Sequence, residues 1–238
     1  MRKLVSVLVL SLFTGLATAA GSGAHLDSVD VDLSDQASLQ RGARLFMNYC
    51  MSCHSASFMR YNRMGRDLGL TDELVQENLM FASDKVGSLM KASMTVEAAR
   101  AAFSTVPPDL SLTGRSRGAD WIYTYMRSFY RDAGAVSGWN NSVFDKVAMP
   151  HVLHDLQGEQ RAVKDEAGHI TGFELARAGS MSEKEYDAAM RDLTNFMVYL
   201  AEPAKLDRYR IGGYVMIFMF VFFFLLYLVK KEYWRDIH

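Results

Sequence analysis

The residues of this sequence best suited to carry chemistry are two cysteines followed directly by a histidine. Cys50-Met51-Ser52-Cys53-His54 has the form C-x-x-C-H, and the chain contains 2 cysteines in all. This spacing is the attachment pattern of c-type haem. Two thiols one helical turn apart can each add to a vinyl group of one porphyrin, and the adjacent histidine then lies under the iron. The motif therefore predicts one covalently bound haem c, attached through Cys50 and Cys53 and ligated by His54.

Two other interpretations of the motif need features that the sequence supplies poorly. A structural zinc site requires two further cysteine or histidine ligands, and the candidates after the motif are His151 and His154. A redox-active dithiol is typical of a βαβ pattern around the cysteines, which this sequence does not show. Haem attachment is the interpretation that the motif favours.

An iron that only transfers electrons needs a second axial ligand, usually histidine or methionine. The chain has 15 methionines, and we expect most of them to fill the core. Met149 differs because residues 140–151 have the composition of a loop and Pro150 biases Met149 toward an extended backbone. Spacing alone favours Met149 and leaves His151 and His154 as rivals.

Two amphipathic helices are expected to hold the haem between them. The first covers residues 38–49, and a glycine on its inner face would let another helix backbone approach closely. The second follows a capping box at residues 182–185 and stops before Pro203. The inner face of the first helix carries Leu39, Gly42, Phe46 and Tyr49.

The N-terminus has the features of a secretory signal peptide. A basic pair precedes an apolar run over residues 4–17, and small residues follow it. We expect cleavage after Ala19 or Ala20, which makes residues 1–19 a signal peptide and residues 20–204 an exported haem domain. A permanent N-terminal anchor is the alternative.

The C-terminal part contains an uncharged apolar run, about residues 211–229, that predicts a membrane-spanning helix. At about 1.5 Å per residue it spans about 28 Å, close to the hydrocarbon thickness of a bilayer. Basic and aromatic residues suited to a membrane interface follow at residues 230–235. Residues 205–238 are thus expected to form a transmembrane anchor with a short cytoplasmic tail.

The overall composition argues against a nucleic-acid partner. Half of the residues are hydrophobic and the net charge is −1, with no basic run or face. Acidic residues are clustered instead, and such clusters either steer a basic protein partner or form a solvated face. The clustered residues are Asp27, Asp30, Asp32, Asp35, Asp67, Asp72, Glu73 and Glu77.

Several longer motifs occur together with the haem motif. They are Ser38–Ala43, Cys53–Ser55 with Arg60 and Tyr61, Glu97–Ala102 leading into Pro107–Ser111, Val147–Leu153, and Tyr199–Pro203 before the apolar run. In these motifs the chain resembles the cytochrome c1 family, the haem subunits of the cytochrome bc1 complex. The resemblance extends over nearly the whole mature chain. The loop at residues 147–153 is similar to the bacterial version of the family. The chain lacks the additional cysteine pair that some members carry.

The resemblance implies a mainly α fold, with a c-type cytochrome haem domain and a single C-terminal transmembrane helix. It implies an electron-carrier subunit, not itself an enzyme, of a quinol:cytochrome c oxidoreductase in a respiratory chain. A Rieske iron–sulfur protein would reduce the haem, which would then reduce a c-type cytochrome. Cytochrome b would pack beside the membrane helix in a dimeric complex. The haem domain would lie on the periplasmic side of a bacterial inner membrane.

The resemblance also implies roles for particular residues. It selects Met149 as the second axial ligand of the iron beside His54. The carbonyl near Pro108 would accept a hydrogen bond from the histidine and orient its ring. Arg117 would pair with a haem propionate, because a guanidinium fork suits a carboxylate. Arg115 is close enough in sequence to be that partner instead.

Two other function classes remain as alternatives. A membrane-tethered haem enzyme, such as a peroxidase or an oxidase subunit, would need an open sixth position on the iron. A haem-based sensor or a free-standing electron shuttle would work without a cytochrome b partner. The identity of the sixth ligand and of the partner subunits separates these classes.

Overall fold

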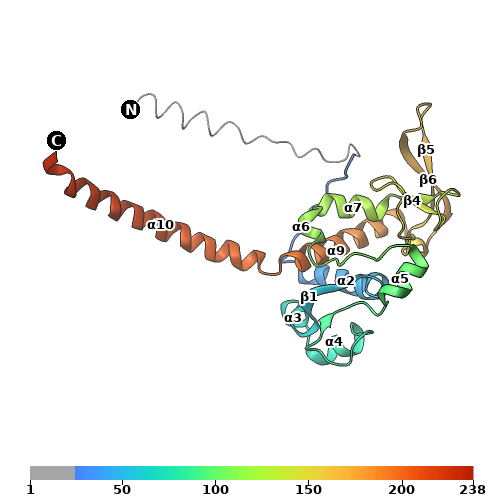
Figure 1. Cartoon of the computed structure of the whole chain (residues 1–238), viewed down its shortest axis with the longest axis horizontal. Helices are drawn as coiled ribbons and strands as arrows, with labels where there is room; N and C mark the ends of the chain where they lie inside the picture. Colours follow the sequence, from blue (N-terminus) through green and yellow to red (C-terminus); the bar gives the residue numbers. More distant parts are fainter. Residues whose placement is uncertain (1–24, 238) are drawn as a thin grey trace.

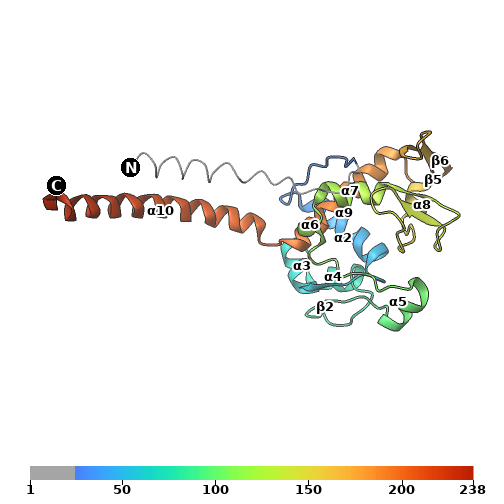
Figure 2. The same ribbon diagram turned by 45° about the horizontal axis from the view of Figure 1, so that its top comes forward.

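A long C-terminal helix extends away from a folded body in both views of the chain (Figures 1 and 2). The computed structural model describes residues 25–237, so the predicted signal peptide and its cleavage site lie outside the described residues. Helices dominate the described part, and its strands form only two-stranded ribbons. The mainly α fold that the sequence predicted is therefore confirmed.

The helices of the described part follow one another as α2 (Gln36–Leu45), α3 (Tyr61–Asp67), α4 (Asp72–Asn78), α5 (Val96–Phe103), α6 (Thr113–Ser116), α7 (Ala119–Arg127), α8 (His154–Gln157), α9 (Glu183–Ala201) and α10 (Lys205–Tyr233). Two shorter helical turns are η1 (Phe46–Cys50) and η2 (Arg235–Ile237). The turn η1 is π-helical and continues α2 directly into the haem motif. Periodicity predicted one regular helix over residues 38–49, and it did not indicate this wider turn. Such π-helical turns occur mostly within α-helices and often at functional sites.

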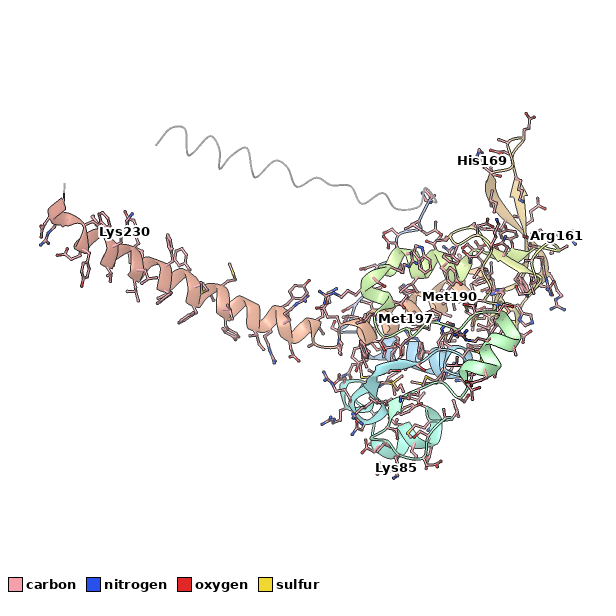
Figure 3. All side chains as sticks on the ribbon, viewed as in Figure 1. Lys85, Arg161, His169, Met190, Met197 and Lys230 are labelled. Atoms are coloured by element: carbon pink, nitrogen blue, oxygen red, sulfur yellow. The ribbon has the colours of Figure 1, made fainter. Side chains whose placement is uncertain are left out.

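Within residues 25–237, three antiparallel two-stranded ribbons, which helical patterning did not predict, supplement the helices. The strand β1 (Ala56–Arg60) pairs with β2 (Leu89–Met90), β3 (Phe129–Arg131) with β4 (Trp139–Asn141), and β5 (Gly158–Lys164) with β6 (Ile170–Ala178). The β5–β6 hairpin projects from the body, with Arg161 and His169 along it (Figure 3). These ribbons connect the helices around the motif without forming a shared sheet.

Helices α2 and α9 cross with their backbones in close approach. A Cβ atom added at Gly42 would lie 2.1 Å from the carbonyl oxygen of Asp192 on α9. The buried carboxylate of Asp192 accepts hydrogen bonds from Ser38 Oγ at 2.7 Å and from Arg41 Nε at 2.6 Å. This contact confirms that the two predicted helices pack across one another, with the glycine at the crossing.

The boundaries of α9 follow from local sequence. Ser182 caps its first turn, and the Glu185 side chain accepts a hydrogen bond from the Ser182 backbone at 2.8 Å, which completes the predicted capping box. The helix ends at Ala201, before Pro203. Its residues Met190 and Met197 lie inside the body (Figure 3) and are almost fully buried. Helix α9 is central to the domain because it packs against α2, α6, α7 and α8.

Helix α10 contains the whole predicted membrane span. It has 29 residues, a length of about 43 Å at about 1.5 Å per residue. Its side chains are exposed on every face of the isolated chain, and Lys230 lies near its far end (Figure 3). Within residues 25–237 it is the one helix long and apolar enough to cross a membrane. A single C-terminal anchor is therefore part of the fold.

The close helix crossing leads to a stability prediction. Replacing Gly42 by Ala should lower the free energy of unfolding by about 3 kcal/mol, because the added methyl group meets backbone that cannot move aside. Urea denaturation of the detergent-solubilised protein, followed by circular dichroism, measures this change. Gly87→Ala is the matched control, since an added Cβ meets nothing within 4 Å, and it should change stability by less than about 0.5 kcal/mol. Equal stability of the two variants would contradict the predicted crossing.

Candidate haem site

A cavity of about 510 Å³ is lined both by the C-x-x-C-H motif and by the segment that carries Met149. Its volume is typical of small-molecule and cofactor pockets, which measure about 300–1,000 Å³. Its wall comes from the motif, α7, α9 and the loops before α6 and α8. Apolar side chains dominate it, including Leu110, Ile122, Met126, Val147, Val152 and Met197. The cavity thus suits a large, mostly apolar ring.

The two thiols are held on the wall of this cavity by a tight turn. The backbone N–H groups of Cys53 and His54 both donate to the carbonyl of Cys50, at 3.1 and 2.8 Å. Cys50 is buried and Cys53 is half-buried, and both are free thiols that line the cavity. Burial raises the pKa of Cys50 to about 12, so this thiol stays protonated at neutral pH. The arrangement presents two sulfur atoms to the same ligand.

The ring of His54 is oriented by a backbone carbonyl. Its Nδ1 lies 2.8 Å from the carbonyl oxygen of Pro108 and donates to it, because a carbonyl can only accept. Burial lowers the pKa of His54, which favours the neutral imidazole. With Nδ1 protonated, Nε2 is the nitrogen that can bind a metal. The contact predicted between His54 and Pro108 is present in the structure.

The segment that supplies Pro108 is fastened to β1. The N–H of Leu110 donates to the carbonyl of Ser55 at 2.8 Å, and Asp109 accepts from the N–H of Ser57 at 3.0 Å. Both bonds join the loop before α6 to the residues just after the motif. The orientation of His54 therefore depends on a loop that is itself hydrogen-bonded to Ser55 and Ser57, just after the motif.

Met149 lies on the wall of the same cavity, half-buried and within reach of α7. Its loop is shaped by Asn141, whose side chain is 1% exposed. The Asn141 amide accepts from the N–H of Val143 at 2.9 Å and of Phe144 at 3.2 Å, and it donates to the Tyr125 carbonyl at 2.8 Å. The Asn141 side chain thus provides hydrogen-bond partners for backbone groups that regular secondary structure does not pair in this loop.

The two rival histidines lie outside the lining of the cavity. His151 is 3% exposed, stacked on the ring of Phe129 at 4.9 Å, and in edge contact with Trp139 at 5.0 Å. Burial lowers its pKa to about 4, so it is neutral at physiological pH. His154 packs beside His151, with ring centroids 6.5 Å apart. Met149 thus lies on the cavity wall, whereas both histidines pack against aromatic rings outside the cavity lining.

Of the two candidate arginines, Arg117 belongs to the cavity wall and Arg115 does not. The Arg117 guanidinium lies 5.0 Å from the ring centroid of Trp121, which also lines the cavity. This stacking positions the charged group at the rim while leaving its N–H groups free for an acid.

Sequence reasoning missed Tyr125 entirely. Its buried hydroxyl lies 3.5 Å from the sulfur of Met149, and burial raises its pKa, so it remains a hydrogen-bond donor. Four aromatic residues, here called the aromatic ladder, contact one another in order: Trp121, Tyr125, Phe129 and His151. The four-residue spacing of Trp121 and Tyr125 on α7, continued by Arg117 before the helix and Phe129 in β3 after it, was the signal that could have indicated that these residues act together.

The fold and the site define a class of protein. A mainly α domain carries a C-x-x-C-H motif on an apolar cavity, a methionine lines the same cavity, and one apolar helix follows. These are the features of a membrane-anchored c-type cytochrome.

Comparison with known proteins gives the family. The model of the Cytochrome C1 family matches residues 30–173 and 174–237, and the chain belongs to this family. It is 48% identical to cytochrome c1 of Allochromatium vinosum, with full coverage of both chains. It is 45% identical to a protein named ammonia monooxygenase gamma subunit from Nitrosomonas europaea, covering 99% of this chain and 100% of that one. It is 27% identical to cytochrome b/c1 of Bradyrhizobium diazoefficiens, covering 86% of this chain and 34% of that longer one.

Family membership fixes the general role. The chain is a haem-bearing electron-transfer subunit of a cytochrome bc1 complex, held to the membrane by α10. A haem cofactor is thus a property of the family, and the cavity's size, apolar wall and donor atoms fit one.

The Asn141 contacts lead to a prediction about the Met149 loop. Asn141→Ala should lower the free energy of unfolding by about 3 kcal/mol, because several buried backbone groups lose their partner. Asn141→Asp keeps the accepting oxygen and should fall between this variant and the wild type. Asn48→Ala removes an exposed amide with a single bond to the Arg44 carbonyl and should change stability by less than about 0.5 kcal/mol. Denaturant titration of the three variants gives the order, and equal effects of Asn141→Ala and Asn48→Ala would refute it.

Proposed function

We propose that this chain carries one haem c, bound covalently through Cys50 and Cys53, with His54 and Met149 as the axial ligands of its iron. With haem bound, the subunit would accept one electron at a time from a Rieske iron–sulfur protein and pass it to a c-type cytochrome. The subunit itself makes and breaks no substrate bonds. The axial ligands of the iron, the direction of electron flow and the partner proteins go beyond the general role that the family gives.

One observation carries the ligand assignment. A single apolar cavity is lined by both thiols, by the imidazole of His54 and by the thioether of Met149. The fixed Nδ1 contact with Pro108 leaves Nε2 of His54 for the metal. Histidine with methionine is a ligand pair typical of electron-transferring c-type haem.

A bound haem supplies the one-electron iron couple. The residues of the chain would supply its surroundings: the Pro108 carbonyl orients His54, the apolar wall would exclude water, and Arg117, which lines the cavity, would pair with a propionate. The thioether of Met149 closes the sixth position against small ligands. Its soft sulfur also raises the reduction potential.

We further propose the membrane arrangement. Residues 1–19 act as a signal peptide, residues 20–204 form the haem domain on the periplasmic side of a bacterial inner membrane, and residues 205–238 form the anchor. Cytochrome b packs on the exposed apolar faces of α10 in a dimeric complex. The relative named cytochrome b/c1 supports this pairing by its name, since a single long chain there carries both designations.

The acidic residues form an N-terminal cluster at residues 27–35 and a second cluster after the haem motif at residues 67–77, and the two differ in their support for acceptor docking. In the first, Asp27 pairs with Arg127 at 2.5 Å, and Asp35 caps α2, so these carboxylates are used within the domain. In the second, Asp72 and Glu73 are exposed in the first turn of α4. A docking role for acids therefore suits α4 better than the N-terminal segment.

A second candidate function comes from the relative named as a monooxygenase subunit. An oxygen-activating haem would need an open sixth position, and the placement of Met149 on the cavity favours a closed one. Carbon monoxide binding to the reduced wild-type protein separates these functions. Binding indicates the enzyme alternative, and its absence supports the electron carrier.

Covalent attachment is tested by removing the thiols. Cys50→Ala/Cys53→Ala should abolish haem staining after denaturing electrophoresis, because no thioether can form. Ser52→Ala lies between the cysteines, keeps both thiols and should stain like the wild type. Normal staining of the double variant would exclude thioether attachment.

The axial assignment is tested with Met149→Leu. The change keeps side-chain volume, so the fold should survive. The sulfur-to-iron charge-transfer band of the oxidised protein should disappear, the reduction potential should fall steeply, and carbon monoxide should bind the reduced form. We expect no replacement by His151, because it is stacked on Phe129 outside the cavity lining.

The matched control is Met190→Leu, the same change at a fully buried position on α9 that does not line the cavity. It should keep the band and the potential. Persistence of the band in Met149→Leu would show that another residue ligates the iron.

A further inference from the structure

We infer that Tyr125 raises the reduction potential of the haem by donating a hydrogen bond to the sulfur of Met149. This inference rests on the proposed ligation of the iron by Met149. The Tyr125 hydroxyl lies 3.5 Å from that sulfur, a distance within reach of a bond to a large sulfur atom. A thioether has no proton, so the phenol is the donor.

The position of the hydroxyl is fixed from both sides. The Tyr125 ring stacks on Trp121, with centroids 4.8 Å apart and planes 12° apart, and it contacts Phe129 edge-on at 5.1 Å. The residue is 8% exposed and lines the cavity. Among the described residues, Met149 is the one hydrogen-bond partner of this hydroxyl. A buried donor with a single partner is strongly held to it, because losing the bond leaves it unsatisfied.

The same contacts also hold the acceptor. Phe129, which packs on Tyr125, stacks face to face with His151 at 4.9 Å. His151 is two residues beyond Met149 on the same loop. In addition, the Tyr125 carbonyl accepts a bond from Asn141, which shapes that loop from its other end. One set of contacts therefore holds both the Tyr125 hydroxyl and the Met149 sulfur in position.

The direction of the effect follows from charge. A hydrogen bond draws electron density from the sulfur, which then donates less to the iron. Ferric iron carries the larger charge and loses more by this than ferrous iron. The positive end of the O–H dipole also points toward the sulfur, which would add to the cost of the more highly charged ferric state. Both contributions favour reduction and so raise the potential.

Tyr125→Phe tests the inference because it removes one oxygen atom and keeps the stacked ring. At an ambient potential equal to the wild-type midpoint, the ratio of reduced to oxidised haem should fall about threefold. For a one-electron couple at about 59 mV per tenfold, this is a fall of about 28 mV. The sulfur-to-iron charge-transfer band should remain. Redox titration of the purified holoprotein, followed by its visible and near-infrared spectra, gives both readings.

Tyr123→Phe is the control on the same helix. Tyr123 packs against the guanidinium of Arg127 at 4.6 Å and does not line the cavity. Loss of its hydroxyl should leave the potential unchanged. An equal fall in both variants would show a general effect of lost hydroxyl groups and would overturn the inference.

The remaining outcomes separate this inference from the proposed ligation. A persistent band with an unchanged potential in Tyr125→Phe overturns the role of Tyr125 and leaves Met149 as ligand. Loss of the band, or of the holoprotein, in Tyr125→Phe assigns Tyr125 a structural role and also overturns the inference. A wild type without the band overturns both the ligation and the inference.

Discussion

The backbone contact between α2 and α9 is the constraint on which the rest of the domain depends. Gly42 is the residue that permits it, since any Cβ there would meet the carbonyl of Asp192. The side chain of the same aspartate accepts hydrogen bonds from Ser38 and Arg41, which fixes how the two closely packed helices are aligned along each other. Since α2 runs directly into the haem motif and Met197 of α9 lines the cavity, this one crossing positions two of its walls.

The remaining walls are loops, and polar groups hold them where regular structure is absent. The motif side is joined to the Pro107–Ser111 segment by bonds from Leu110 and His54. The Met149 side is shaped by the buried amide of Asn141. Loops of this kind would carry many unpaired backbone groups if they were not bonded in this way. The domain thus closes around an apolar cavity without a continuous sheet.

The aromatic ladder connects these loops to α7. Its rings run from Trp121 at the cavity to His151 on the Met149 loop. Arg117 extends the same line to the rim of the cavity through its contact with Trp121. Helix α7 and its flanking residues therefore carry Arg117, proposed to pair with a propionate, Tyr125, which contacts the proposed sulfur ligand, and Phe129, which contacts the loop of that ligand. This arrangement explains why a histidine that looked like a ligand in the sequence serves as a packing residue.

The sequence by itself determined the features that local rules govern. The C-x-x-C-H spacing, the apolar run at residues 211–229, the capping box at Ser182 and the glycine on α2 each depend on residues close together in the chain. Only the tertiary structure shows that Met149 and Arg117 line the cavity while His151, His154 and Arg115 do not, and that Tyr125 contacts Met149. The contact of Tyr125 with Met149 joins residues 24 positions apart, and that of His54 with Pro108 joins residues 54 positions apart. Periodicity and spacing report which face of an element is apolar, whereas the partner across a cavity depends on how whole elements pack.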